Sequence, residues 1–485
     1  MTSFEPARVR ETAETLLGEH RLPGLSVGVV RGRDLVFAES WGYADIESNT
    51  LMAPEHRQRI ASITKTMVGL CAMALVDEGR LSIDDLVPEL LPDIPFNGHP
   101  ETLAVRHLLT HTGGIGETPE LSQLKDPFSL LFGAPEVSLV EAYRGGVTVE
   151  GPPGTKWAYA NHGYFLLGEI ISRIEGARLP EVVSQRVFRP LGMKNTDLLD
   201  QPRPDLSTGY HRAPDEDARE LMVRAGRKIP DEATVDGINI RHEFTPEWGG
   251  GAAGGVQSTV PDMALYASAL LARGGGIVRP ETFDTMTSPQ WSPHPLIQAW
   301  GLSFAVSRSF GHRSFGHGGN ALGWNSNLAV FPDDGIATII HTNVTFSRFD
   351  HVVQHIKQAV LGAPSVRGEG SALPMELVAA AEGVYEAPTP GPLTNFRIMT
   401  EAGRIQLSAR EGALFLRSRR GRWKHGFRLV PLDSSDPDVF IFDTGDPDPP
   451  KVAIVRDRGR VVTGLHISDG NPWYLRRTDS VEPWV

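Results

Sequence analysis

The chain has 485 residues, of which 40% are hydrophobic and 22% are charged, a composition typical of globular proteins. This length exceeds one ordinary hydrophobic core and predicts two or three domains. The formal net charge of −12 argues against a nucleic-acid partner. Cys71 is the sole cysteine, which excludes an internal disulfide and any Cys-x-x-Cys metal or redox motif. We expect its thiol to be buried and inert.

The first residues lack the apolar core of a secretory signal, and no run approaches the ~18 apolar residues of a membrane span. We therefore expect a cytoplasmic protein without a membrane partner. Residues 5–20 are predicted to be helical. Residues 25–30 and 35–43 alternate like two strands of a hairpin. A helix followed by a hairpin predicts a sheet with helices packed against it.

Ser62 and Lys65 stand three residues apart at the start of a predicted helix. Apolar residues recur at helical spacing from Ile63 to Leu75, and Gly79 ends the pattern. Residues at i and i+3 lie on the same face of a helix, so the Lys65 nitrogen can lie beside the Ser62 hydroxyl. This is the Ser-x-x-Lys arrangement of serine acyl enzymes.

The chemistry of such a pair leaves two roles open for Lys65. A serine hydroxyl must lose its proton to a base as it attacks, and lysine is that base only where burial or nearby cations favour its neutral form. Otherwise its fixed charge assists a second base. The same tetrapeptide also occurs by chance in many helices. In that case Ser62 is only an N-cap and Lys65 is a solvated side chain.

Tyr159 and Asn161 lie on a predicted turn before the helix that contains Phe165 and Ile171. A tyrosine here can relay the Ser62 proton, and the amide of Asn161 can hold the substrate or Lys65. The alternative is an aromatic anchor followed by an asparagine cap. His111 is expected to bond loop backbone rather than a metal, because no third ligand accompanies it and His107. Residues 117–151 are rich in loops and either shape a cleft or form a surface excursion.

Glycine-rich segments occur later in the chain. Residues 249–255 lack a phosphate-loop pattern and are expected to pack closely near the cleft. His317, Gly319 and Asn320 lie between predicted strands at 301–306, 326–331 and 336–342. The backbone N–H of Asn320 is predicted to join that of Ser62 in binding an oxyanion, the alternative being a solvated histidine in a turn. The segment between Asp200 and Trp248 is predicted to be a loop or small lid.

The C-terminal part has a different pattern. His351 and His355 lack the glutamate of a His-Glu-x-x-His motif and are interpreted as solvated. Residues 362–374 have the composition of a linker. Short alternating segments then recur, which predicts a small antiparallel barrel over residues 375–485. Their positions are 396–399, 404–407, 413–416, 439–442, 452–455, 462–467 and 473–475.

Three motifs occur together in this order, Ser62-x-x-Lys65, Tyr159-x-Asn161 and His317-x-Gly319, beside Leu108-Leu-Thr-His-Thr-Gly-Gly114. Together they resemble the class C beta-lactamase, D,D-peptidase and D-aminopeptidase group of penicillin-recognising serine enzymes. The resemblance implies a catalytic domain over residues 1–361, with an antiparallel sheet, flanking helices and an α-helical subdomain. It also implies a lipocalin-like barrel at the C-terminus.

The same resemblance implies roles for the motif residues. Ser62 is the expected nucleophile, and Lys65 and Tyr159 are expected to act together as its general base. Asn161, His317 and Gly319 are expected to line the site. His317 replaces the lysine with which most lactamases and D,D-peptidases hold a substrate carboxylate, so this chain is more similar to the aminopeptidases, esterases and penicillin-binding-type thioesterases of the group.

We therefore expect acyl-enzyme chemistry on peptide esters, thioesters or amides, with no metal and no cofactor. The resemblance suggests release or macrocyclisation of a nonribosomal peptide that has a D-residue at the acyl position. A carrier-protein-bound acyl chain is then a further partner. The alternatives are a D-stereospecific aminopeptidase or amidase, a carboxylesterase, and a non-catalytic penicillin-binding sensor.

Overall fold

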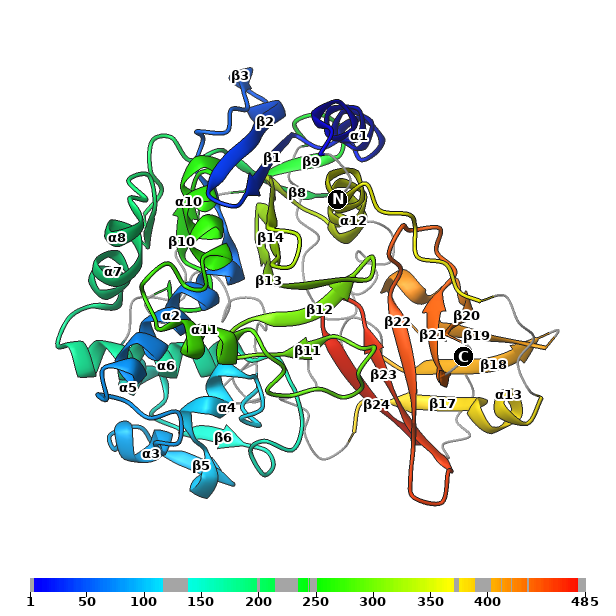
Figure 1. Cartoon of the computed structure of the whole chain (residues 1–485). Coiled ribbons are helices and arrows are strands. Elements are labelled where there is room, and N and C mark those ends of the chain that lie inside the picture. Colours follow the sequence, from blue (N-terminus) through cyan, green and yellow to red (C-terminus); the bar gives the residue numbers. More distant parts are fainter. Residues whose placement is uncertain are drawn as a thin grey trace.

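Two bodies form the molecule, a sheet surrounded by helices and a C-terminal barrel (Figure 1). The computed structural model describes residues 4–116, 138–198, 201–213, 234–242, 244, 251–369, 375–388, 403–410, 412–419, 421–433 and 436–478. Within these residues, no helix is both long and apolar enough to span a bilayer.

The larger body is built on an eight-stranded antiparallel sheet with the order β11-β12-β13-β14-β15-β1-β2-β3. The N-terminal hairpin thus pairs with the last strand of the sheet in the sequence, which places residues 25–30 beside 337–342. The strands are β1 (Gly24–Arg31), β2 (Asp34–Asp45), β3 (Thr50–Leu51), β11 (Ala299–Trp300), β12 (Ala305–Ser309), β13 (His312–Ala321), β14 (Trp324–Phe331) and β15 (Ile336–Thr342).

Side chains of β1 alternate between the two faces of the sheet. Val27 and Val29 pack in one apolar cluster with α1 (Pro6–Glu19) and α12 (Phe349–Leu361), which contact each other. Gly28 faces the opposite side, where a Cβ atom would lie 2.6 Å from Val260 of α10 (Val260–Leu271). The larger apolar cluster, which contains the Ser62 helix, lies on this second side.

Ser62 lies in a 3₁₀ turn, η1 (Ala61–Ile63), which leads directly into α2 (Thr64–Asp77). This helix is buried on all sides over most of its length, since every residue from Thr64 to Leu75 is buried. Helices of the α-helical subdomain share its apolar cluster. They are α3 (Val87–Leu90), α4 (Val105–Leu109), α5 (Leu139–Ala142), α6 (Asn161–Glu175), α7 (Leu179–Val183), α8 (Arg189–Leu191) and α11 (Pro280–Met286). Two of them, α6 and α7, contact α2 directly. The Cys71 thiol is buried within α2, which raises its pKa to about 12, as expected of an inert thiol.

Short strands pair around the main sheet in three small groups. The predicted loop between Asp200 and Trp248 contains two of them, so that prediction was incomplete. The predicted strand 301–306 was also misplaced, because Gly301–Phe304 forms a turn between β11 and β12. The small strands are β4 (Gln58–Arg59), β5 (Phe96–Gly98), β6 (Val147–Val149), β7 (Asp197–Leu198), β8 (Gly209–Arg212), β9 (Asn239–His242), β10 (Val256–Ser258) and β16 (Val344–Thr345).

The C-terminal body is a closed barrel of eight antiparallel strands, preceded by α13 (Met375–Ala381). Alternate residues point inward, as the strict burial alternation of β19 shows. The predicted strand 396–399 lies outside the described residues, while β17 and β20 were missed. The strands are β17 (Gly383–Glu386), β18 (Ile405–Arg410), β19 (Ala413–Ser418), β20 (Phe427–Asp433), β21 (Asp436–Phe442), β22 (Lys451–Arg456), β23 (Val462–Ser468) and β24 (Pro472–Thr478).

The barrel is attached to the larger body by the loop between β21 and β22. Asp448 of this loop accepts hydrogen bonds from Ser309 Oγ (2.9 Å) and from the Phe310 backbone N–H (3.1 Å) at the β12–β13 turn. The segment that follows α12 runs along the barrel, where Val366 N donates to Pro447 O at 2.7 Å. These contacts hold the two bodies in one arrangement.

Buried neutral histidines make the stability of this fold dependent on pH. Burial lowers the pKa of His341, His242 and His466 to about 4. An unfolded chain protonates these rings near pH 6.5. Below that pH the unfolded state therefore binds more protons, and the free energy of unfolding falls as the pH decreases from 6.5 toward 4.

We predict that the fully buried His341 ring alone costs about 2 kcal/mol of stability at pH 5 relative to pH 7.5, and that the half-buried His242 and His466 rings cost less. Denaturant unfolding at several pH values measures this slope. His341→Gln, which removes one fully buried ring, should flatten the slope by about that amount. An equal slope in the variant and the parent would contradict the assignment.

Candidate active site

Ser62 lies on a sharp turn between β4 and α2. Ala61, just before it, has φ of +48°, a left-handed conformation that costs a non-glycine residue about 1–3 kcal/mol. The turn places the partly buried Ser62 at the N-terminal end of α2. The helix dipole there favours negative charge, as an attacking alkoxide requires.

Neighbouring strands hold this turn in place. Ile60 N donates to Val256 O (3.0 Å), and Val256 N donates to Thr64 Oγ1 (3.1 Å), so β10 clamps both sides of Ser62. Ser326 Oγ of β14 donates to Ile60 O at 2.7 Å. The turn is therefore fixed by the main sheet and by β10 together.

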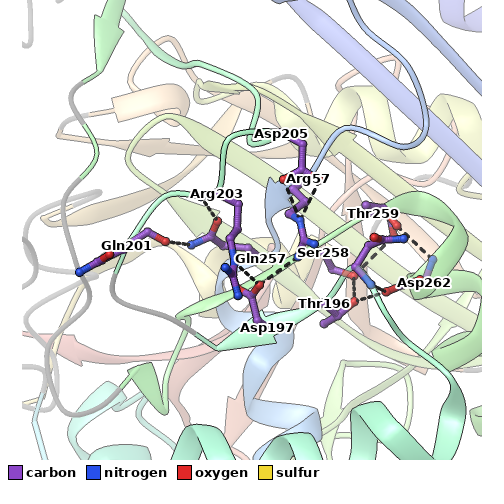
Figure 2. Close-up of polar contacts among 11 residues, drawn as sticks. Arg57, Thr196, Asp197, Gln201, Arg203, Asp205, Gln257, Ser258, Thr259 and Asp262 are labelled. Atoms are coloured by element: carbon purple, nitrogen blue, oxygen red, sulfur yellow. Dashed lines mark hydrogen bonds and ion pairs between the residues drawn. The ribbon is translucent and has the colours of Figure 1, made fainter.

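A network of charged and polar side chains secures β10 in turn (Figure 2). Arg57, directly before β4, pairs with Asp205 (2.9 Å) and Asp197 (3.0 Å). Thr196 donates to Asp262 Oδ2 at 2.8 Å, which ties β7 to α10. Asp197 is the first residue of β7, and Arg57 precedes β4 on the other side of β10, so their ion pair ties together the two strands that flank β10.

Lys65 has no exposed surface, and its amine lies among three oxygen atoms. Nζ is 3.1 Å from Ser62 Oγ, 2.8 Å from Asn161 Oδ1 and 2.6 Å from Ala253 O. The last two can only accept, so Nζ donates a hydrogen to each. A neutral amine can do so and still direct its lone pair to the Ser62 hydroxyl, whereas an ammonium would donate to all three. The geometry thus suits both roles that the sequence left open.

Two of these partners, Asn161 and Ala253, lie in segments that the sequence analysis placed near the site. Asn161 begins α6, and its side chain contacts Lys65. Ala253 belongs to the glycine-rich segment, whose described residues 251–255 pack closely near Ser62 as expected. A Cβ atom on Gly255 would lie 2.8 Å from Gly251 Cα, so this backbone needs glycine to fold back on itself.

Tyr159 lies beside Lys65, on a loop that His111 positions. The centre of its ring is 5.0 Å from Lys65 Nζ. His111 Nδ1 accepts from Ala160 N (3.1 Å), and His111 O accepts from Ala158 N (2.9 Å). The prediction that His111 bonds loop backbone is confirmed, and these bonds hold the residues on both sides of Tyr159.

An aromatic cluster surrounds this loop and reaches the barrel. The Trp157 and Trp300 rings lie 5.2 Å apart, and both belong to the same apolar cluster as the barrel core. Tyr159 packs against this cluster. Trp291 bridges the two bodies, 6.2 Å from Trp157 and 6.2 Å from His466 of β23. The barrel core is thus continuous with the wall beside Tyr159.

His317 lies on β13 with its ring buried next to this wall, 5.6 Å from Trp300 and 6.1 Å from Tyr159. Nδ1 is 2.5 Å from the Gly318 carbonyl oxygen, which can only accept, so Nδ1 carries the hydrogen. Burial, together with nearby Lys65, lowers the pKa of the imidazole to about 3. His317 is therefore neutral at physiological pH, and its buried Nε2 is an acceptor that has no partner among the described residues.

Gly319 is the point at which β13 meets the Ser62 turn. A Cβ atom there would lie 2.3 Å from Ile60 O and 2.1 Å from Ser326 Oγ. Asn320 follows with an exposed side chain. The pairing of β13 with β12 ends at Gly316, whereas its pairing with β14 continues through Asn320. The structure thus brings the edge of β13 beside Ser62, where the sequence predicted an oxyanion site.

Sequence reasoning missed some residues that shape the site. Ala253 contributes only a carbonyl oxygen, which no side-chain pattern reveals. Trp300 lies in a segment without a motif, and its role depends on the barrel packing behind it. The aromatic residues around Tyr159 offered a signal, since Trp157 stands two positions before it.

Comparison with known proteins places this geometry in a family. The Beta-lactamase family profile matches residues 9–362. The chain belongs to the beta-lactamase family. Its relatives include D-aminopeptidases, and its structural neighbours include a penicillin-binding protein homologue. The prediction of a serine hydrolase family from the motifs is thus confirmed. The predicted fold class is also confirmed, including the closed barrel.

The curated relatives of this beta-lactamase family member include D-aminopeptidases. That of Brucella anthropi is 25% identical over 372 residues, which are 75% of this chain and 64% of that protein. That of Brucella ovis is 26% identical over 355 residues, 71% of this chain and 61% of its own length. The chain thus aligns with less than two thirds of the length of these relatives.

Solved structures share the fold of this beta-lactamase family member. The D-amino acid amidase from Ochrobactrum anthropi SV3 has a TM-score of 0.61 at 22% identity, covering 74% of this chain and 99% of the amidase. The structure of SurE has a TM-score of 0.60 at 21% identity, covering 97% and 99%. The octameric penicillin-binding protein homologue from Pyrococcus abyssi has a TM-score of 0.59 at 21% identity, also covering 97% and 99%.

The contact between Gly319 and the Ser62 turn predicts a sharp difference between neighbouring glycines. Gly319→Ala should displace the turn and lower kcat by at least about 10²-fold, because misplacing reacting groups by about 1 Å is that costly. Gly318→Ala is the matched control, since a Cβ atom there would have its nearest neighbour at 4.0 Å. Steady-state kinetics and thermal unfolding of both variants provide the measurement. Equal activity in the two variants would contradict the proposed contact.

Proposed function

We propose that the chain is a serine acyl-enzyme hydrolase that cleaves amides or esters of D-amino acids and their peptides. The observation that carries this proposal is the Lys65 amine, fully buried and 3.1 Å from Ser62 Oγ. A buried amine beside a hydroxyl is arranged to take its proton. The D-aminopeptidase relatives support the choice of acyl group.

The reaction proceeds in two steps. Ser62 Oγ attacks the carbonyl carbon and its proton passes to Lys65 while Tyr159, beside that amine, relays the proton to the leaving group. The C–N or C–O bond of the substrate breaks, and an ester to Ser62 remains. Water gives a proton to Lys65 and attacks the carbonyl carbon of this ester. The bond between Ser62 Oγ and the acyl carbon then breaks, the acid leaves, and Lys65 returns the proton to Ser62 Oγ. In both steps the oxyanion is held by the backbone N–H groups of Ser62 and Asn320.

His317 and Asn161 support this chemistry without a fixed charge toward the substrate. His317 places a neutral imidazole where most lactamases and D,D-peptidases of the group have a lysine; its unprotonated Nε2 can only accept a hydrogen bond, whereas a lysine ammonium can only donate one. Asn161 positions Lys65 through its 2.8 Å hydrogen bond. The open edge of β13 beyond Gly316 pairs with the substrate backbone. A neutral His317 favours substrates without a carboxylate at this place.

A second candidate is transfer of the acyl group to a peptide amine, which releases or macrocyclises a peptide thioester. The aromatic wall favours this reading, since Trp300 and Trp157 are only 2% and 8% exposed. An apolar wall limits the access of water to the acyl enzyme, and an amine held by the substrate itself then competes better for the acyl group. A carrier-protein-bound acyl chain would then deliver the substrate.

We predict that Ser62→Ala lowers kcat by at least about 10³-fold without unfolding the chain. Lys65→Arg should lower kcat by roughly 10²–10⁴-fold, because a guanidinium keeps the charge but does not act as a base. Lys357→Arg is the matched control, since Lys357 is also buried but lies on α12, across the sheet from α2. Activity close to wild type in Lys65→Arg would overturn the role of Lys65 as base.

A substrate panel tests the proposed specificity. We predict turnover of D-phenylalanine amide at a kcat/KM at least about tenfold above that for benzylpenicillin, whose carboxylate would face the neutral His317 in place of a lysine. L-phenylalanine amide is the stereochemical control. Chromatography of the products gives the rates. Efficient penicillin hydrolysis with no amide turnover would contradict the proposal.

A linear peptidyl thioester ending in a D-residue separates the two candidate functions in the same assay. Mass spectrometry of the products distinguishes the cyclic peptide from the linear acid. Linear acid alone supports the hydrolase, and a predominant cyclic product supports acyl transfer.

A further inference from the structure

Two histidines and a glutamate meet on the side of the sheet away from Ser62. Glu19 ends α1, His20 follows it, and His351 lies in the first turn of α12. Their potential ligand atoms all lie within 4.8 Å of one another, the one such group of three among the described residues. Glu19 Oε1 is 3.9 Å from His20 Nε2 and 3.9 Å from His351 Nε2.

His351 is oriented for this cluster by the barrel. Its Nδ1 lies 2.7 Å from Asp446 Oδ1, in the loop between β21 and β22. The carboxylate accepts, so Nδ1 carries the hydrogen and the lone pair of Nε2 faces Glu19. A carboxylate that holds the far nitrogen of a histidine is the usual partner of metal-binding imidazoles. The expectation that His351 is solvated was wrong, since its side chain is only 17% exposed.

His20 supplies an independent observation. Its side chain is 6% exposed, and Nε2 is buried with no hydrogen-bond partner in the described part of the chain. Leaving a buried ring nitrogen unpaired costs free energy, so such an atom indicates that a ligand or an ion binds there. Arg212 donates to the backbone oxygen of His20, and the ring contacts Phe346, so the imidazole is held in place.

The donor set indicates a particular class of ion. Two imidazoles and one carboxylate are a known zinc ligand set, whereas calcium and magnesium favour oxygen ligands. Zinc–ligand bonds of about 2.0–2.1 Å place tetrahedral ligand atoms about 3.3 Å apart. The three ligand atoms lie within 4.8 Å of one another, so on binding the widest separation shortens by at most about 1.5 Å, and the Glu19 oxygen, 3.9 Å from each ring nitrogen, moves about 0.6 Å closer to each. Glu19, with its side chain 48% exposed, is free to make that movement.

We propose that Glu19, His20 and His351 bind a divalent zinc-class cation, with water as the fourth ligand and Asp446 positioning His351. The ion joins α1 to α12 and, through Asp446, to the barrel. It is a structural site, because it lies across the sheet from the Ser62 helix. At His20, the Glu19 carboxylate opposes the nearby positive charges of Arg348 and Arg212.

The test uses the full chain, stripped of metal with EDTA and titrated with ZnCl₂ by calorimetry and with CoCl₂ by visible absorption. We expect one equivalent to bind, tetrahedral Co²⁺ bands to appear, and zinc to raise the thermal unfolding temperature. His20→Gln and His351→Gln should each weaken binding by more than about 100-fold, and Asp446→Asn by about 10–100-fold.

Two further variants keep the result interpretable. Glu19→Gln changes a half-exposed side chain, so it should fold normally and still lose the metal. His312→Gln is the matched control, because it removes another histidine paired with an aspartate, outside the cluster, and should keep full binding. Turnover at Ser62 serves as the folding check. Absence of stoichiometric binding, or equal binding by the parent, Glu19→Gln and His351→Gln, would overturn the proposal.

Discussion

Burial of the Lys65 amine is the constraint on which the catalytic body depends. An amine without water must find its partners within the protein, and those of Lys65 come from three separate segments: η1, the start of α6 and the glycine-rich segment before β10. The Ser62 turn is held by β10 and β14, the start of α6 by the His111 loop, and the glycine-rich segment by close backbone packing. The site is thereby assembled before any substrate arrives, which is what positioning catalysis requires.

The barrel extends this organisation rather than standing apart from it. Its core is continuous with the aromatic wall next to Tyr159, and its β21–β22 loop is bonded to the β12–β13 turn through Asp448. β13 contains His317 and Gly319. The proposed metal cluster adds a third connection through the same loop. The barrel is therefore connected both to the wall beside Tyr159 and to the turn that leads into the strand with His317 and Gly319.

Much of this was predictable from the sequence because the relevant signals are local. The Ser62–Lys65 spacing, the N-terminal hairpin and the alternating barrel strands each depend on short-range periodicity. The misplaced strand at 301–306 and the missed strands β17 and β20 depend on partners distant in the sequence. The same holds for Ala253, which contributes only backbone, and for His351, whose burial depends on α1 and the barrel. A solvated reading of His351 was reasonable from one helix alone, and only the tertiary contacts overturn it.

The most direct test of the account is intact-protein mass spectrometry of the full chain, quenched with acid within one turnover of a D-phenylalanine ester, followed by peptide mapping. The account predicts a mass gain equal to the acyl group, located on Ser62 and absent from Ser62→Ala. In Lys65→Arg the adduct should form more slowly by the same factor as turnover. Turnover without any adduct, or an adduct on another residue, would contradict the assignment of Ser62 as the nucleophile.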